Sequence, residues 1–193
     1  MISLKSLICI LPIMSICFIG CGESESTTIK PDQISIDKAI KTRSLLMLRT
    51  INKARNEERN CYDGKGVVGP SFPLTWSEEL YASALEHSID LAMSDTFEHL
   101  GSGTKFDTTG KEYGHKSHFK ERIQKNNYIN YSIVGENIAA GQGTIEKVIN
   151  EWLESPLHCQ NIMNNDFSEV GIAVSGNIDS YYGLYWTQNL GTK

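Results

Sequence analysis

The sequence has no long hydrophobic run and no surplus of positive charge. Its longest apolar stretch covers residues 7–19, which is shorter than the roughly 20 residues that a helix needs to cross a bilayer. A polytopic membrane protein is therefore excluded. With 18 Lys and Arg against 23 Asp and Glu, the formal net charge is -5. The chain has no overall attraction for phosphate backbones, and we expect no nucleic-acid partner.

Proline is scarce as well, with 5 residues among 193, whereas 40% of the residues are hydrophobic and 21% are charged. This composition excludes collagen-like, low-complexity and mostly disordered chains. The length suits one globular domain with tails. Motifs of common hydrolases are missing too, since the chain contains neither Gly-x-Ser-x-Gly nor His-Glu-x-x-His. Their absence argues against hydrolysis.

The N-terminal residues have the features of a targeting signal. Lys5 precedes the apolar run, and the small residue Gly20 stands directly before Cys21. This order predicts a secretory signal over residues 1–20. Its end resembles a bacterial lipobox, in which the cysteine becomes the lipid-modified first residue (palmitate among its acyl chains). The alternative is an ordinary signal with an incidental cysteine. We expect a lipoprotein anchored to a membrane of the cell envelope, periplasmic or surface-exposed.

Residues 21–34 are small and polar, which predicts a flexible tether, and residues 35–193 form the predicted folded domain. Once the signal is removed and Cys21 is lipid-modified, Cys61 and Cys159 remain in an oxidising setting, where a disulfide is expected. Closing that loop would stabilise the fold by about 4–5 kcal/mol. The alternative makes Cys159 a nucleophile beside His158, although helix neighbours point about 100° apart.

Hydrophobic periodicity predicts a mixture of helices and strands. We expect strands over 131–138, 170–175 and 181–190, the last two joined by a hairpin turn at 176–179. The segment 101–114 is predicted to be a polar loop. Helices are expected within 36–59, from a cap at Thr75 or Ser77 to Asp95, over 119–125, from Thr144 to Leu153, and as a short turn over 158–163. The order indicates an α+β fold with a small, mainly antiparallel sheet.

Several short blocks place polar residues among apolar or glycine-rich neighbours. The blocks are Leu74–Trp76, His87–Ala92, Phe97–Gly101, Gly135–Ala139, Ser155–Met163, Phe167–Gly171 and Tyr185–Gln188. In this order they resemble the signature blocks of the bacterial branch of the CAP superfamily (cysteine-rich secretory, antigen 5 and pathogenesis-related 1 proteins, or SCP-like domains). The resemblance implies an α-β-α sandwich with a central cleft and use outside the cytoplasm.

The same resemblance implies which residues meet in the cleft. His99 and His158 correspond to the two cleft histidines and Glu136 to the glutamate of the Gly-Glu-Asn block. The position of a further family glutamate falls on Ser155, so the neighbouring Glu154 is the candidate for a fourth cleft residue.

Other polar residues near these blocks have simpler expected roles. Asn137 and Gln188 are expected to satisfy backbone groups beside the cleft. His87 is interpreted as a structural histidine that bonds backbone or a neighbouring side chain. His115 and His118, in the longer loop after His99, are interpreted as solvated, with a second metal site as the alternative.

This residue set permits several functions. Two imidazoles and a carboxylate can hold Zn²⁺ or another divalent cation with one position open. Family members bind divalent metal in some cases and lipids or sterols in others, and most have no established enzymatic activity, so we expect a non-enzymatic binding module. The first alternative is a metal-dependent peptidase or esterase with His99 and His158 on the metal and Glu136 as general base. The second is a structural envelope protein.

Overall fold

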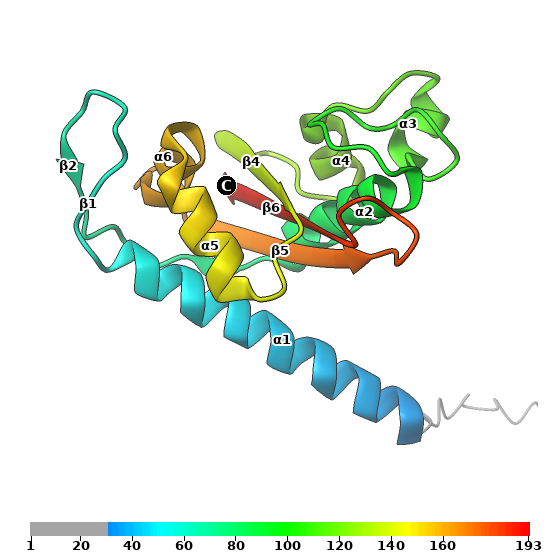
Figure 1. Cartoon of the computed structure of the whole chain (residues 1–193), viewed down its shortest axis with the longest axis horizontal. Helices are drawn as coiled ribbons and strands as arrows, with labels where there is room; N and C mark the ends of the chain where they lie inside the picture. The colour runs from blue at the N-terminus through cyan, green and yellow to red at the C-terminus, as the bar shows by residue number, and fades with distance from the viewer. Residues whose placement is uncertain (1–30) are drawn as a thin grey trace, which may run out of the picture.

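The computed structural model describes residues 31–193 (Figure 1). The predicted signal and Cys21 lie outside the described residues. The first helix, α1, covers Pro31–Arg55, so it takes in the last four residues of the predicted tether. It also ends four residues earlier than the expected limit of 59, because a short hairpin of β1 (Arg59–Asn60) and β2 (Val67–Val68) begins there.

The main sheet has four strands in the order β3-β5-β6-β4. These are β3 (Thr75–Trp76), β4 (Ile133–Ala140), β5 (Glu169–Gly176) and β6 (Leu184–Thr192). β6 pairs antiparallel with both β4 and β5, whereas the short β3 runs parallel to β5. The prediction of a small, mainly antiparallel sheet is therefore confirmed. β4 lies at one edge, and its outer side pairs with no strand of the described chain.

Helices cover both faces of the sheet (Figure 1). α1, α5 (Ile145–Glu154) and α6 (Pro156–Met163) pack on one face around a core that includes Ile51, Trp152 and Ile172. α2 (Glu78–Ser94) and α4 (Phe119–Lys125) pack on the other face. The α+β class and the α-β-α sandwich are confirmed.

Local chemistry sets the ends of these helices. The Ser77 hydroxyl accepts a hydrogen bond from the Leu80 amide at the start of α2, and Asp95 adopts a left-handed conformation at its end. Thr144 caps α5 in the same way. The expected caps Ser77 and Thr144 are confirmed. The segment 101–114, expected to be a loop, contains the short helix α3 (Thr108–Tyr113), because Asp107 accepts from the Gly110 amide and caps it.

A disulfide joins Cys61, beside the small hairpin, to Cys159 in α6, with their Cα atoms 5.4 Å apart. The predicted pairing is confirmed, and the bonded sulfur of Cys159 leaves no thiolate for a nucleophile. Among residues 31–193, no helix is both long and apolar enough to cross a membrane.

Candidate functional site

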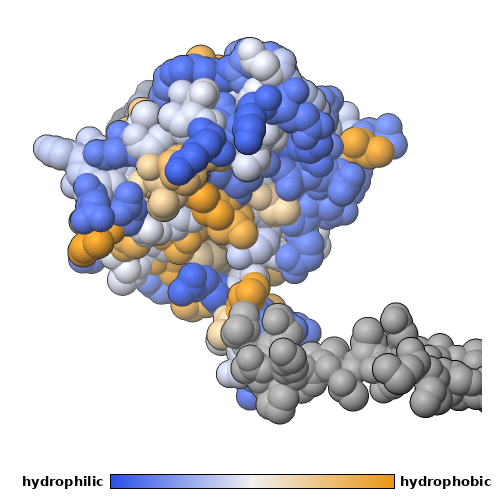
Figure 2. Space-filling model, turned by 90° about the vertical axis from the view of Figure 1, so that its right-hand side faces the viewer, coloured by the Kyte–Doolittle hydropathy of each residue, from blue (hydrophilic) through white to orange (hydrophobic). Residues whose placement is uncertain are grey.

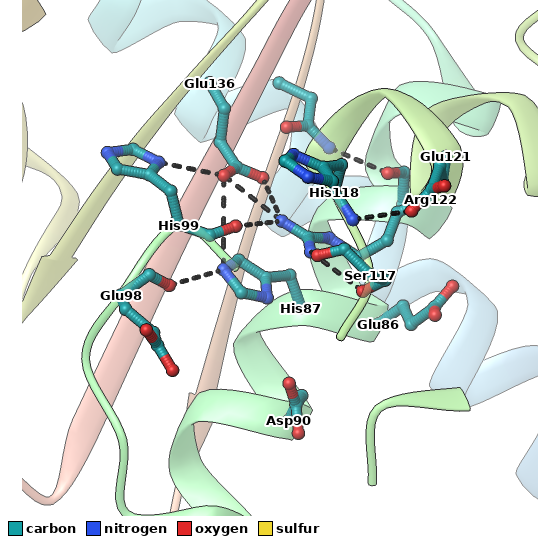
Figure 3. Close-up of polar contacts among 12 residues, drawn as sticks. Glu86, His87, Asp90, Glu98, His99, Ser117, His118, Glu121, Arg122 and Glu136 are labelled. Carbon is teal, nitrogen blue, oxygen red and sulfur yellow. Dashed lines mark hydrogen bonds and ion pairs between the residues drawn. The ribbon is translucent and has the colours of Figure 1, made fainter. Parts of the chain in front are cut away.

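Glu136 is a buried carboxylate at the edge of the sheet. It lies in β4, and its side chain points toward α2 and α4 with only 1% of its surface exposed. One guanidinium nitrogen of Arg122, from α4, lies 3.2 Å from Oε1 and 3.0 Å from Oε2 of this carboxylate. Arg122 is equally buried and also donates to the Ser117 and His99 carbonyl oxygens. The two charges therefore form a pair that is enclosed by protein (Figure 3).

Two histidines flank the Glu136 carboxylate (Figure 3). The Nδ1 atom of His99 lies 3.0 Å from Oε1, and its side chain remains 52% exposed. The fully buried His87 bonds the Glu98 carbonyl oxygen through Nε2, at 3.1 Å, and that nitrogen lies 4.0 Å from Oε1. His87 therefore bonds backbone, as predicted, whereas His99 presents the rest of its ring to solvent.

The charges at this site follow from burial and from the Arg122 guanidinium. Burial tends to raise the pKa of Glu136, but the charge of Arg122, then of His87 and His99, outweighs it and holds that pKa below its ordinary value. Burial lowers the pKa of His87 to about 4. Because His87 is consequently neutral at pH 7 and adds its charge only at low pH, Arg122 is the main partner that keeps Glu136 ionised at pH 7.

His158 reaches the same strand from the opposite face of the sheet. Successive strand residues point to opposite faces, so Asn137 points toward α6, where its amide donates to the His158 carbonyl oxygen at 3.3 Å and to the Gln188 side chain at 2.8 Å. Asn161 in α6 donates to the Glu136 carbonyl oxygen at 3.3 Å. Asn137 thus satisfies a backbone group, as predicted. The Gln188 side chain, which was predicted to do the same, instead accepts from the Asn137 side chain and holds it in place.

The imidazole of His158 lies in a hollow of about 280 Å³ over the free edge of β4. One side consists of α5 and α6 residues, the other of aromatic residues that lie beyond the ends of α2 and β5. The lining residues are Phe97, Ile138, Ala139, Ala140, Glu151, Trp152, Ser155, His158 and Tyr182. Burial lowers the pKa of His158, the nearby charge of His99 lowers it further, and Glu151 opposes the shift.

The remaining candidates lie outside this hollow. Glu154 is exposed at the end of α5 and does not line it, whereas Glu151, one helical turn earlier, does. His99 is not part of the lining either, although it influences the charge of His158. His115 is half exposed and bonds Glu121 at 3.0 Å. His118 is exposed at the start of α4.

The donor set does not fit a three-ligand metal site. Both Glu136 oxygens face Arg122, and one also faces His99, so this carboxylate has no free edge for a cation. His99 and His158 then leave two imidazoles, one fewer than the three protein ligands usual in catalytic zinc sites. In the part of the chain that the structure covers, no group of three or more His, Cys, Asp or Glu side chains has metal-binding geometry.

Three parts of this site have no clear signal in the sequence. Arg122 reads as an ordinary surface residue of a short helix, and only its position four residues after His118, in the helix predicted over 119–125, could have suggested it. Glu151 could have been found from the period of α5, since it precedes Trp152 and lies seven residues before His158. Phe97 and Tyr182 lie 85 residues apart in the sequence, and only the fold brings their rings within 5.8 Å.

Comparisons with known proteins match the chain to one family and one fold. A family model described as "CAP: Cysteine-rich secretory protein family" matches residues 48–190. The uncharacterized protein YkwD of Bacillus subtilis is 35% identical over 118 residues, which are 60% of this chain and 38% of YkwD. The chain thus spans less than two-fifths of that relative.

Two solved structures share the fold. One is an extracellular protein containing an SCP domain from Bacillus anthracis, with a TM-score of 0.58 and 22% identity over 87% of this chain and 45% of that one. The other is an outer surface protein from Borrelia burgdorferi, with a TM-score of 0.54 and 19% identity over 81% of this chain and 93% of that one.

Proposed function

Because this chain belongs to the CAP family of cysteine-rich secretory proteins, we propose that it is a lipid-anchored, non-enzymatic binding module of the cell envelope. Its ligand is a small molecule with an apolar face, taken up in the hollow over the free edge of β4. The observation that carries this proposal is the imidazole of His158. It is only partly buried, it lines an aromatic hollow, and no hydrogen bond within residues 31–193 occupies its ring.

The walls of the hollow suit an apolar ligand. Phe97 and Tyr182 are 47% and 45% exposed, both line the hollow and their rings lie 5.8 Å apart, so one ligand can contact both aromatic side chains. The volume of about 280 Å³ lies just below the range of about 300–1,000 Å³ for pockets that bind drug-sized molecules, so it suits a smaller ligand. Two larger hollows, of about 450 Å³ beside α1 and about 460 Å³ beside the small hairpin, include no histidine in their lining.

The polar end of the hollow supports orientation of the ligand. His158 and Glu151 both line it, and burial disfavours the charged form of His158. A neutral imidazole offers one donor and one acceptor. A ligand with a hydroxyl or an N–H group could therefore bond His158 while its apolar face lies against Phe97 and Tyr182.

Catalysis has less support than binding. Glu136 is enclosed and held ionised by Arg122, so it is a poor general base for a substrate in the hollow. Ser155 also lines the hollow, but within residues 31–193 no hydrogen bond joins Ser155 to the His158 side chain, or His158 to Glu151. A serine nucleophile needs such a relay.

The test is a ligand-observed NMR titration with indole and phenol as probes. We expect both to bind the wild type and to bind at least tenfold more weakly when Phe97 and Tyr182 are both changed to Ala, or in His158→Ala. The matched control is Tyr113→Ala with His115→Ala, another aromatic and histidine pair whose rings lie 6.1 Å apart outside the hollow. Equal binding by all variants, or no binding by the wild type, would contradict the proposal.

The two alternatives predict different results in the same preparations. A hydrolase would cleave p-nitrophenyl acetate in a Zn²⁺-dependent reaction that Glu136→Gln abolishes and that the aromatic variants retain in part. A purely structural protein would neither bind the probes nor cleave the ester. We expect binding without turnover.

A further inference from the structure

Charge is unevenly divided between α1 and the rest of the domain. Residues 31–55 contain six Lys or Arg and two Asp, a net charge of +4, whereas residues 56–193 contain ten Lys or Arg and nineteen Asp or Glu, a net charge of -9. A basic helix is thus attached to an acidic body. Segregation of this kind gives a molecule a preferred orientation on a charged surface.

The outward face of α1 combines these cations with apolar side chains. Met47, Ile51 and Ala54 are buried and mark the inward face. At 100° per residue, the opposite side carries a set that we name the basic stripe, with spacings of 7, 8, 11 and 15 residues from its first member. The basic stripe consists of Lys38, Leu45, Leu46, Arg49 and Lys53.

Every member of the basic stripe is exposed. Leu45 and Leu46 are 43% and 51% exposed. Between residues 31 and 193, no ion pair includes Lys38, Arg49 or Lys53. The fold therefore uses neither the charges of these cations nor much of the surface of these leucines.

The position of α1 leaves this face accessible. The helix runs along one side of the domain, and its N-terminal half extends past the other elements (Figure 1). Apolar side chains also gather on the face of the molecule above its N-terminal end (Figure 2). Cys21 lies ten residues before Pro31 in the sequence, and ten residues span at most about 35 Å. A chain anchored at Cys21 would hold α1 close to the bilayer.

We propose that the basic stripe docks on an anionic lipid bilayer. Lys38, Arg49 and Lys53 contact lipid phosphates, and Leu45 and Leu46 enter the boundary between headgroups and acyl chains. The leucines favour a lipid surface over a soluble polyanion, which would gain nothing from them. The same surface repels the acidic body, so the α1 side faces the membrane.

This docking is independent of the binding proposed for the hollow, because no member of the basic stripe lines it. It would act as a second membrane signal beside acylation at Cys21. The experiment must therefore remove the acyl chains, so that only the helix is measured.

The test uses residues 22–193, which keep the whole fold because all three core clusters come from residues within 47–190. Co-sedimentation is measured with vesicles of phosphatidylglycerol and phosphatidylcholine in equal amounts, and with vesicles of phosphatidylcholine alone. We expect binding to the anionic vesicles, a marked decrease at higher salt, and little binding to the neutral ones.

The decisive variant changes Lys38, Arg49 and Lys53 to Gln. Because each cation contributes about a fivefold factor to partition onto an anionic surface, the affinity should fall about 100-fold. The matched control changes the exposed Lys111, Lys120 and Lys147 to Gln, with the same change in net charge and a small expected effect.

Three results would overturn the proposal. The first is equal weakening by the stripe and control variants, which would indicate a net-charge effect. The second is a double variant, Leu45→Ser and Leu46→Ser, that binds vesicles as well as the wild type does, while soluble polyphosphate is bound as tightly as vesicles are. This pair of results would make the partner a polyanion. The third is absence of vesicle binding together with a dimer that the stripe variant loses, which would make the partner a second copy. Circular dichroism of each variant confirms that it folds.

Discussion

At the scale of single residues, Arg122 determines the chemistry of the candidate site. Its guanidinium bonds both oxygens of Glu136 and the carbonyl oxygen of His99. A buried carboxylate without such a partner would be protonated or destabilising. The sequence block around Glu136 indicated a cleft acid, but the enclosed ion pair assigns it a supporting role, in which it orients the ring of His99.

His87 makes stability depend on pH. Its pKa is about 4 in the fold and 6.5 ordinarily, so between these values the unfolded chain binds a proton that the folded chain does not. The contribution of neutral His87 to the free energy of unfolding is complete above pH 6.5. It is lost as the pH falls toward 4. The full loss is about 3 kcal/mol. Urea unfolding at a series of pH values should show this decline in the wild type.

The matched variant for this measurement is His87→Gln, which cannot titrate and keeps a donor for the Glu98 carbonyl oxygen. Glu136 and His158, whose pKa values are also lowered, contribute in the same direction in both proteins. The difference between the two curves therefore reports His87, both through its own titration and through its effect on the pKa of Glu136. Parallel curves between pH 4 and 6.5 would show that His87 is not the titrating group.

At the scale of elements, the approach of α2 to the sheet depends on Gly171 in β5. A Cβ atom built there would lie 2.0 Å from the backbone nitrogen of Tyr81, at the start of α2. No side-chain adjustment relieves a clash with backbone, so α2 would have to move. The close approach of α2 to β5 therefore sets the position of His87, which lies on α2 beside the Glu136 carboxylate.

We expect Gly171→Ala to lower the free energy of unfolding by at least about 1–3 kcal/mol. The control is Gly143→Ala, since a Cβ atom at that position has nothing within 4 Å, and its effect should stay within about 0.5 kcal/mol. Chemical denaturation measures both. Similar values for the two variants would mean that α2 shifts at little cost.

The observed helix boundaries show which helices can be predicted from sequence patterns. The helices from Glu78, Phe119 and Ile145 have strong caps or a clear apolar period, and their predicted positions agree with the structure. The helix over 108–113 was missed because it contains Gly110 and has no apolar stripe. It forms because Asp107, in addition to capping it, accepts from the Gly103 and Ser117 amides, and Ser117 lies beyond the segment.

At the scale of the whole molecule, the disulfide joins residues 98 apart in sequence. Cys61 and Cys159 are 2% and 0% exposed, so the bond links the small hairpin to α6 within the core. The chain-entropy model gives about 4–5 kcal/mol for a loop of this length. Cys61→Ser with Cys159→Ser should lower the unfolding midpoint in urea accordingly.

Reductant provides the control for this prediction. It should destabilise the wild type to a similar extent and leave the double serine variant unchanged. Labelling by a thiol reagent in the unfolded, unreduced wild type would contradict the pairing. Because α6 carries His158, loosening of α6 should also change the NMR signal of that imidazole.

The sequence by itself determined the fold class, the disulfide pairing and the helices with strong caps, because these depend on local periodicity, capping chemistry and the number of cysteines left to pair. It also marked His99, Glu136 and His158 through their blocks. Only the tertiary structure decided what these residues do. Strand alternation places Glu136 and Asn137 on opposite faces of β4, so the carboxylate pairs with Arg122 on one side while His158 faces an aromatic hollow at the free edge. Such an arrangement depends on which elements meet across the sheet, and no local pattern in the chain encodes it.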